Sequence, residues 1–355
     1  MMVRASYAPY SLVFRETAIT SRQKMDVKET FLLRLDDGAR HAVAEIPLFR
    51  GLSAEDTPGF EAVLADFCRL CGNVTDRQTE SLPSSIRFGY EAAKASLDGN
   101  SQEQLFDTPW SRGEKGIRIN GLVWMGDRRA MARRIRAKLD GGFRCVKLKI
   151  GGIDFADELA LLRYIRSEFG PGDIELRLDA NGAFTPRNAY DRLGYLSELG
   201  IHSIEQPIRA GQWDAMAEIC ARSPIPVALD EELIGIRTDD EKRRMLEAIR
   251  PAYIILKPSL CGGLSEADRW IDLAEKRGTG WWATSALESD LGLNAIAQWV
   301  SQREPQMPQG LGTGLLYTNN FPSPLELRGE ELWFNPEKRF SIPAIDWIRP
   351  HTTTL

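Results

Sequence analysis

The chain has 355 residues, of which 43% are apolar and 27% charged, and its formal net charge is −5 at pH 7. This length fits a barrel domain with an attachment, or two medium domains, in a globular protein. The charge and the lack of a basic stripe interleaved with aromatic residues argue against a nucleic-acid partner. No segment has the apolar length of a signal peptide or a membrane span, so we expect a cytoplasmic protein that does not enter membranes.

Residues 1–115 predict a separate α+β domain. Two β-rich runs flank Asp36-Asp37-Gly38, which is a hairpin signal. The spacing of Ser53 and Asp56 resembles a capping box and predicts that the next helix begins there. The stretch Ser84–Leu97 predicts another helix.

The segment that follows repeats a β-rich run, a polar residue, a loop and an amphipathic helix. The polar residues recur every 25 to 30 positions, which is the size of one strand–loop–helix unit, at Lys149, Asp179, Glu205, Asp230, Lys257 and Ser285. A first unit begins at Arg118, and a short last strand fits residues 309–314. The repeat predicts parallel strands joined by helices, and the count of eight predicts a (β/α)8 TIM-type barrel over residues 116–320.

An open doubly wound sheet is the alternative to the barrel. It predicts a glycine-rich phosphate turn after the first strand, and residues 119–130 do not contain one. Residues 321–355 hold turn residues and short apolar runs, and we expect this segment to return to the first domain.

The stretch "VKLKI" alternates two lysines, Lys147 and Lys149, with the apolar residues Val146, Leu148 and Ile150. Side chains alternate between the two faces of a strand, so the lysines share one face. In a barrel the apolar face contacts the surrounding helices, and active sites form at the carboxyl ends of the strands. We therefore expect the lysines to point inward at the site.

Asp179, Glu205 and Asp230 would meet at neighbouring strand ends. Three carboxylates suit Mg²⁺, with Mn²⁺ able to substitute, whereas Zn²⁺ prefers histidine or cysteine. None of the three histidines lies at a predicted strand end. The alternative is that the acids only form salt bridges with the lysines inside the barrel.

A lysine next to another ammonium group and a divalent cation is expected to have a lowered pKa, which makes it a usable general base. Lys149 and Lys257 would lie on either side of the strands that carry the acids. A metal beside them can hold a substrate carboxylate and stabilise the enediolate that forms when the α-proton leaves.

These residues together resemble the enolase superfamily: Lys-x-Lys on the second strand, acids on the third to fifth and lysine on the sixth. The resemblance implies a modified (β/α)7β barrel with an α+β capping domain, which is built from the N-terminal part and the C-terminal tail. It implies that Lys149 is the acid/base and Lys257 the opposing lysine. It also implies that Asp179, Glu205 and Asp230 are the metal ligands. Lys147 is a further candidate catalytic residue, more often an electrostatic or structural partner than a second base.

Other motifs select a family within the superfamily. No histidine occurs between residues 203 and 350, which excludes the mandelate-racemase type, and residues 284–287 lack the Asp-x-Asp of dipeptide epimerases. The stretches "LRLDANGAF", "LKPSLCGG" and "SALESDLGLNAIAQW" resemble the o-succinylbenzoate synthase family of menaquinone biosynthesis, in the muconate-lactonizing-like subgroup. Asn181 and Ser285 would then be polar contacts of a small carboxylate substrate.

The resemblance implies a metal-dependent lyase. The reaction would be the Mg²⁺-dependent syn-dehydration of 2-succinyl-6-hydroxy-2,4-cyclohexadiene-1-carboxylate to 2-succinylbenzoate, through a metal-stabilised enediolate. Alternatives are an N-succinylamino acid racemase, a cycloisomerase, or an inactive barrel retained for binding. Asn181 could instead be a turn residue, Ser285 could be a helix cap, and Glu231 or Glu232 could also approach the metal. The sequence does not give the oligomeric state.

Overall fold

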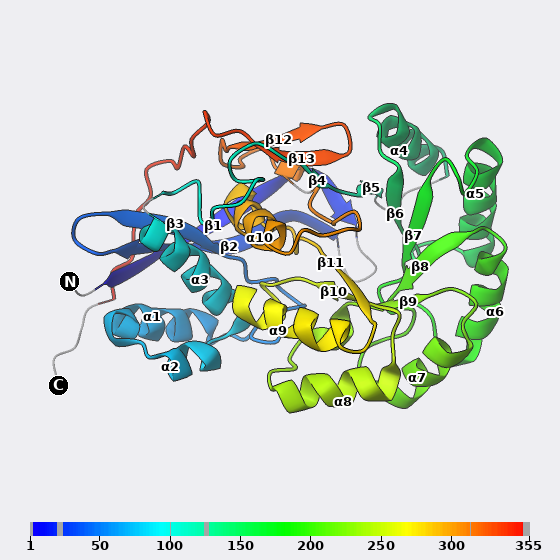
Figure 1. Cartoon of the computed structure of the whole chain (residues 1–355), viewed down its shortest axis with the longest axis horizontal. Helices are drawn as coiled ribbons and strands as arrows, with labels where there is room; N and C mark the ends of the chain where they lie inside the picture. Colours follow the sequence, from blue (N-terminus) through cyan, green and yellow to red (C-terminus); the bar gives the residue numbers. More distant parts are fainter. Residues whose placement is uncertain (1–2, 20–23, 100, 124–127, 313, 351–355) are drawn as a thin grey trace.

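The computed structural model describes residues 3–19, 24–99, 101–123, 128–312 and 314–350. Figure 1 shows a three-stranded antiparallel sheet with helices beside it, next to a curved parallel sheet with helices on its outer side. The first unit consists of β1 (Arg4–Ile19), β2 (Lys24–Asp36), β3 (His41–Ile46), α1 (Phe60–Leu70), α2 (Asp76–Ser81) and α3 (Ser84–Gly99).

The predicted hairpin and the predicted second helix of this unit are confirmed as β2–β3 and α3. The predicted start of the first helix at Ser53 is wrong, because α1 begins at Phe60. Pro58 and Gly59 stand between these positions and disfavour a continuous helix. The Ser53 hydroxyl instead accepts a hydrogen bond from the Phe49 N–H at 2.9 Å and closes a turn.

The second unit begins with two short strands and then alternates helices and strands in the predicted order. Its strands are β4 (Ile117–Arg118), β5 (Gly121–Val123), β6 (Cys145–Lys149), β7 (Glu175–Asp179), β8 (Ile201–Glu205), β9 (Val227–Leu229), β10 (Tyr253–Leu256) and β11 (Gly280–Ala283). Its helices are α4 (Arg128–Asp140), α5 (Phe155–Glu168), α6 (Pro186–Ser197), α7 (Trp213–Arg222), α8 (Asp239–Ile249), α9 (Leu264–Glu275) and α10 (Asp290–Ser301). Within the described ranges, β5 to β11 form one sheet in sequential order, with every pair parallel.

Residues 309–310 connect the two edges of this sheet, where the sequence predicts a last strand. Directly before β5, the Asn120 N–H donates to the Gln309 carbonyl at 2.9 Å, and the Gly310 N–H donates to the carbonyl of Ala283, the last residue of β11, at 2.8 Å. The pairing is limited to parallel bridges and forms no longer strand in the described part of the chain. The sheet therefore closes as the predicted modified barrel, and the open doubly wound sheet is excluded.

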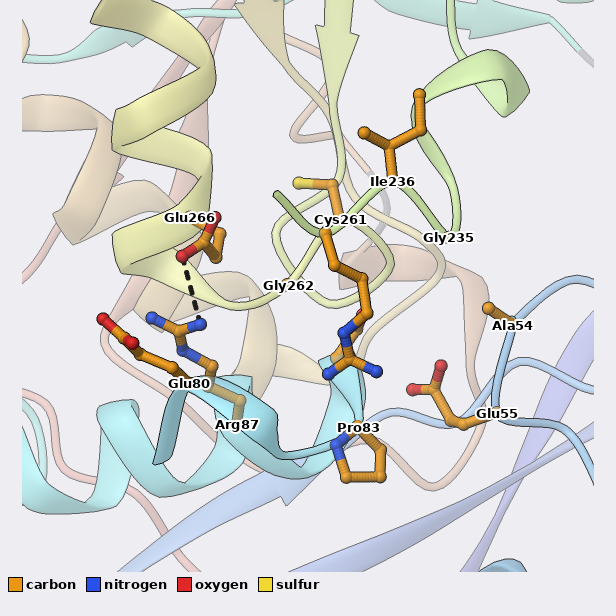
Figure 2. Close-up of a pocket in the computed structure, with 12 residues that line it drawn as sticks. Ala54, Glu55, Glu80, Pro83, Arg87, Gly235, Ile236, Cys261, Gly262 and Glu266 are labelled. Atoms are coloured by element: carbon orange, nitrogen blue, oxygen red, sulfur yellow. Dashed lines mark hydrogen bonds and ion pairs between the residues drawn. The ribbon is translucent and has the colours of Figure 1, made fainter. Parts of the chain in front are cut away.

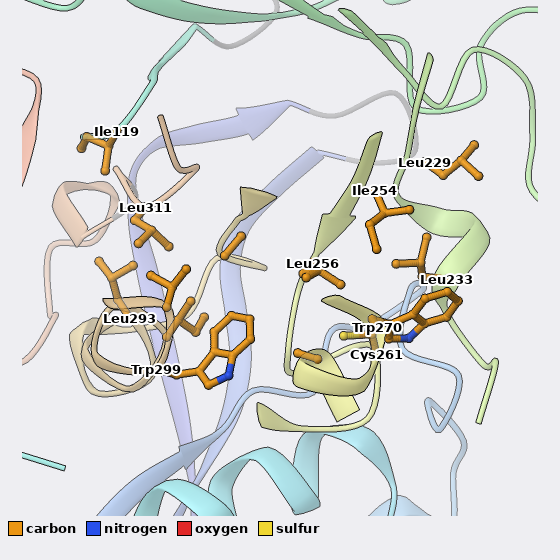
Figure 3. Close-up of a cluster of buried hydrophobic side chains, with 14 of the residues drawn as sticks. Ile119, Leu229, Leu233, Ile254, Leu256, Cys261, Trp270, Leu293, Trp299 and Leu311 are labelled. Carbon is orange, nitrogen blue, oxygen red and sulfur yellow. The ribbon is translucent and has the colours of Figure 1, made fainter. Parts of the chain in front are cut away.

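The alternation in β6 is confirmed. Val146, Leu148 and Ile150 are buried in the main hydrophobic core, which lies between the strands and the outer helices. Figure 3 shows part of this core, where Trp270 of α9 and Trp299 of α10 lie among apolar side chains. Fully burying an aliphatic side chain stabilises a fold by roughly 1.5–3 kcal/mol, so this packing fixes the face that the strands turn inward.

The interior of the barrel below the strand ends is filled rather than open. The Arg177 guanidinium stacks on the Trp282 ring at 4.4 Å from its centroid and donates to the Pro308 carbonyl at 2.8 Å. His202 stacks against Tyr253, with 5.2 Å between the ring centroids. These side chains close one end of the barrel, so access to its interior is from the carboxyl ends of the strands.

The C-terminal segment packs on both units. β12 (Leu325–Arg328) and β13 (Glu331–Phe334) form a hairpin that pairs with β4. Farther along, Tyr7 of β1 and Ile348 exchange two backbone hydrogen bonds of 3.1 and 2.8 Å. The segment thus contacts the N-terminal sheet, while the domain boundaries at residues 115 and 320 stay predictions.

Candidate active site

Five ionic side chains lie at or directly after the carboxyl ends of five consecutive strands. Lys149, Asp179 and Glu205 are the last residues of β6, β7 and β8, and Asp179 is the register partner of both others. Asp230 follows β9 directly, and Lys257 follows β10 directly. We call these five side chains the rim cluster, and their placement is the one that the repeat of the sequence predicts.

Lys147 is buried on β6, two residues before Lys149 and on the same face of the strand. It pairs with two acids of the rim cluster. Its ammonium lies 2.9 Å from Asp179 Oδ2 and 2.5 Å from Glu205 Oε2. Both of these partners are carboxylates, and only 7% of the residue is exposed. The geometry therefore favours an electrostatic partner over a second base.

The two lysines of the rim contact different acids from opposite sides of the acid strands. The Lys149 ammonium donates to Asp179 Oδ2 at 2.8 Å and to Asn181 Oδ1 at 2.6 Å. The Lys257 ammonium donates to Asp230 Oδ2 at 2.5 Å. Since β7, β8 and β9 separate β6 from β10 in the sheet, the amines flank the acids as the sequence predicts.

The charges of the cluster shift its pKa values strongly. Burial raises the pKa of Asp179, but the ammonium groups of Lys147 and Lys149 outweigh burial and hold that pKa far below its usual range. Burial and the negative charge of Asp179 raise the pKa of Glu205 to about 8. Two adjacent carboxylates in a low dielectric cannot both ionise easily, which explains the opposite directions.

The carboxylates of the protein raise the pKa of Lys147 and Lys257, whereas the sequence predicts a lowered lysine pKa. Burial lowers the pKa of Lys147, but Asp179 and Glu205 outweigh it and raise that pKa. The pKa of Lys257 is raised in the same way, against burial, chiefly by Asp230. A divalent cation beside the lysines would oppose this effect of the carboxylates.

The rim offers oxygen donors but does not hold them in a closed ligand shell. Within the described residues, no group of three or more His, Cys, Asp and Glu side chains is arranged to hold a metal ion. Lys147 and Lys257 contact the carboxylates instead. Glu205 Oε1 is nevertheless buried without a hydrogen-bond partner among the described residues, which is costly unless a ligand satisfies it. The donor set therefore fits a hard cation bound to the carboxylate oxygens.

The two glutamates after Asp230 have different roles. Glu231 Oε1 accepts from Asn181 Nδ2 at 3.1 Å and thus faces the rim. Glu232 turns away and accepts from Gln206 Nε2 at 3.1 Å and from the Gly211 N–H at 2.8 Å. Strand alternation does not separate them, because residues 231–233 form a 3₁₀ turn.

Ser285 lies two residues beyond β11, where its hydroxyl donates to Glu288 Oε2 at 2.6 Å. Glu288 Oε1 accepts from the Ser259 hydroxyl at 2.5 Å, so this buried carboxylate connects the loops after β10 and β11. α10 begins later, at Asp290, with Ser289 at its cap position. Ser285 therefore does not cap that helix, and sequence reasoning missed Glu288 because its partners are far apart in the chain.

Comparison with known proteins settles the family. The family model "Enolase C-terminal domain-like" matches residues 130–330. The chain is 46% identical over 357 residues to the o-succinylbenzoate synthase of Desulfotalea psychrophila, which covers 91% of this chain and 97% of the relative. The chain belongs to the enolase superfamily, in its o-succinylbenzoate synthase group.

Solved structures agree with this placement. The crystal structure of MenC from Desulfotalea psychrophila matches with a TM-score of 0.79 and 42% identity, over 94% of this chain and 100% of that one. An o-succinylbenzoate synthase from Thermosynechococcus elongatus, complexed with Mg in its active site, matches with a TM-score of 0.72. Its identity is 22%, over 89% of this chain and 94% of that one, so it supports the fold alone. No helix in the described ranges is long and apolar enough to cross a membrane.

Proposed function

We propose that this chain is an o-succinylbenzoate synthase that converts 2-succinyl-6-hydroxy-2,4-cyclohexadiene-1-carboxylate to 2-succinylbenzoate by syn-dehydration. The observation that carries the proposal is the rim cluster, in which one amine lies on each side of three buried acids. The similarity over nearly the whole chain to a relative of that name supports the choice of substrate.

Asp179, Glu205 and Asp230 are the residues that would hold Mg²⁺, or Mn²⁺ in its place. Their oxygens suit a hard cation, and the unsatisfied Glu205 Oε1 supplies a donor that the protein itself does not use. When bound, the cation supplies positive charge for the substrate carboxylate and for the negative charge that develops on it.

Lys149 is the proposed acid/base. Its neutral amine would take the proton α to the substrate carboxylate, and the resulting ammonium would donate a proton to the departing hydroxyl. Both groups leave from one face of the ring, so one side chain serves both steps. Proton transfer by a positioned side chain contributes about 10²–10⁴-fold to a rate.

Lys257 is proposed to remain charged on the other face. Its amine would stay protonated while the dienediolate forms, because it takes no proton from the substrate. A fixed ammonium there stabilises the anion by electrostatic and cation–π attraction. Aromatisation of the ring provides much of the driving force, so the main tasks of the protein are to position groups and stabilise charge.

The test is a spectroscopic assay of the purified protein with the cyclohexadiene substrate. We expect aromatic product with Mg²⁺ and none after treatment with a chelator. A protein that leaves this substrate unchanged at saturating Mg²⁺ would refute the proposed activity.

N-succinylamino acid racemase activity is the second candidate. Amines on both faces of the acids also suit removal of an α-proton from one side and its return from the other. Incubation of an N-succinylamino acid in deuterated water distinguishes the two activities. Rapid deuterium uptake without dehydration of the ring substrate would favour the racemase.

A further inference from the structure

Asn181 bridges the proposed base and a buried glutamate that the proposed mechanism does not use. Its Oδ1 accepts from the Lys149 ammonium at 2.6 Å, and its Nδ2 donates to Glu231 Oε1 at 3.1 Å. Glu231 is only 6% exposed and comes from the turn after β9, two strands away from β7. The three side chains form a continuous hydrogen-bonded row across the rim.

Glu231 determines which end of the amide faces the lysine. An ionised carboxylate only accepts hydrogen bonds, so the amide must present its NH₂ to Glu231. The carbonyl oxygen then faces Lys149. If the amide turned over, it would place NH₂ against the ammonium and oxygen against the carboxylate, and both contacts would be repulsive.

The backbone holds Asn181 in place for this contact. Its φ is +43°, in the left-handed region that asparagine adopts more readily than most residues. The N–H of Gly182 donates to the Gln206 carbonyl at 2.7 Å, and the Asn181 N–H donates to Asp179 Oδ1 at 3.1 Å. The backbone position from which the side chain starts is therefore fixed.

We propose that Asn181 is a positioning residue for Lys149 and that Glu231 fixes its orientation, which assigns Asn181 a role other than a substrate contact. A neutral amine has two N–H bonds and one lone pair. With Asp179 Oδ2 and Asn181 Oδ1 accepting the two N–H bonds, the lone pair points in the remaining tetrahedral direction, where the α-proton is taken. The inference rests on the proposed function.

The test uses Glu231→Gln, which keeps the size of the side chain but can present either NH₂ or oxygen to Asn181. We expect kcat to fall about 10- to 100-fold, because a misaligned base loses part of its positioning advantage. KM should stay within about twofold, because substrate binding is not altered. The primary isotope effect on kcat, measured with substrate deuterated at the reacting carbon, should rise as proton transfer becomes rate-limiting.

A double variant tests the donor and acceptor directions of the hydrogen bonds in this row. Asn181→Asp alone opposes two carboxylates and should lower kcat at least as far as E231Q. In the double variant N181D/E231Q, the new amide can donate to the new carboxylate, which still accepts from Lys149. We expect the double variant to recover at least tenfold over N181D, which is a coupling that independent sites would not show.

Glu175→Gln is the matched control at the opposite end of the barrel. Glu175 Oε1 accepts from Arg177 Nε at 2.7 Å, so E175Q should lower stability without changing the isotope effect. The inference is refuted if the unaltered protein dehydrates the substrate and E231Q matches it in kcat and isotope effect. It is also refuted, whatever the activity, by a crystal structure of the unaltered protein with bound Mg²⁺ in which the Asn181 side chain contacts neither Lys149 nor Glu231. Failure of the unaltered protein to act on the ring substrate would instead refute the proposed function.

Discussion

Two of the buried groups of acids and bases among the described residues can be compared, and only one of these two has the features of an active site. The first is the rim cluster. The second lies where α3 meets the start of α9, and Figure 2 shows its ion pair between Arg87 and Glu266, 3.2 Å apart. Arg87 also contacts Glu91 at 2.9 Å, and Lys242 pairs with Glu266. We call this second group the α3–α9 cluster.

The difference lies in how completely the carboxylates are satisfied. Glu91 accepts from the N–H of Leu264 at 2.6 Å and of Ser265 at 3.2 Å, so it caps the exposed N–H groups at the start of α9. In the rim cluster, Glu205 Oε1 has no partner among the described residues. A buried charge cluster is thus evidence for a site only where polar atoms are left for a ligand and where the strand ends provide access.

The largest expected effect concerns the rim. Lys149→Ala should lower kcat for dehydration by about 10³-fold or more, because it removes the acid/base. The melting temperature of K149A should change little, because the amine contacts only Asp179 and Asn181 among the described residues. Enzyme assays and thermal unfolding of the same preparation check this. Normal turnover by K149A would end the proposed mechanism.

The α3–α9 cluster should show the opposite pattern. Glu91→Ala removes a helix cap and leaves Arg87 with one fewer carboxylate, so we expect a loss of about 2–3 kcal/mol in the free energy of unfolding. kcat of the folded enzyme should stay within about twofold. Urea unfolding and assays below the transition measure both, and a tenfold loss of kcat without loss of stability would contradict the comparison.

The pH dependence of stability should separate the clusters further. The pKa of Glu205 is about 8 in the folded chain, which is above its ordinary value in an unfolded chain. Its contribution is therefore fully present below about pH 4.5 and is lost as the pH rises through about 8. Metal-free protein should lose on the order of 1–3 kcal/mol relative to Glu205→Gln across this window. If the free energy of unfolding changed equally with pH in the two proteins, ionisation of Glu205 would not destabilise the folded chain in this range.

Spacing alone predicted most of the barrel and its site. Lys149, Asp179, Glu205, Asp230 and Lys257 were found because each lies at or directly after the end of a strand, and strand ends converge in this fold. Arg177 could also have been assigned to the interior, since it shares a strand face with Asp179 in "LRLD".

Other features could not be predicted, for physical reasons. Glu231 faces the rim because a 3₁₀ turn begins directly after Asp230, and alternation says nothing about side chains in a turn. Glu288 depends on contacts between loops after different strands, which spacing does not reveal. The row from Lys149 through Asn181 to Glu231 joins three strand ends, so it is visible only once the sheet is assembled.

Calorimetric titration of Mg²⁺ into metal-free protein tests the central claim most directly, namely that the rim acids share one divalent cation. We predict one site per chain for the unaltered protein, the same site in E91A, and at least tenfold weaker binding in E205Q. Equal Mg²⁺ affinity in E205Q and the unaltered protein, or no binding to either, would contradict the assignment.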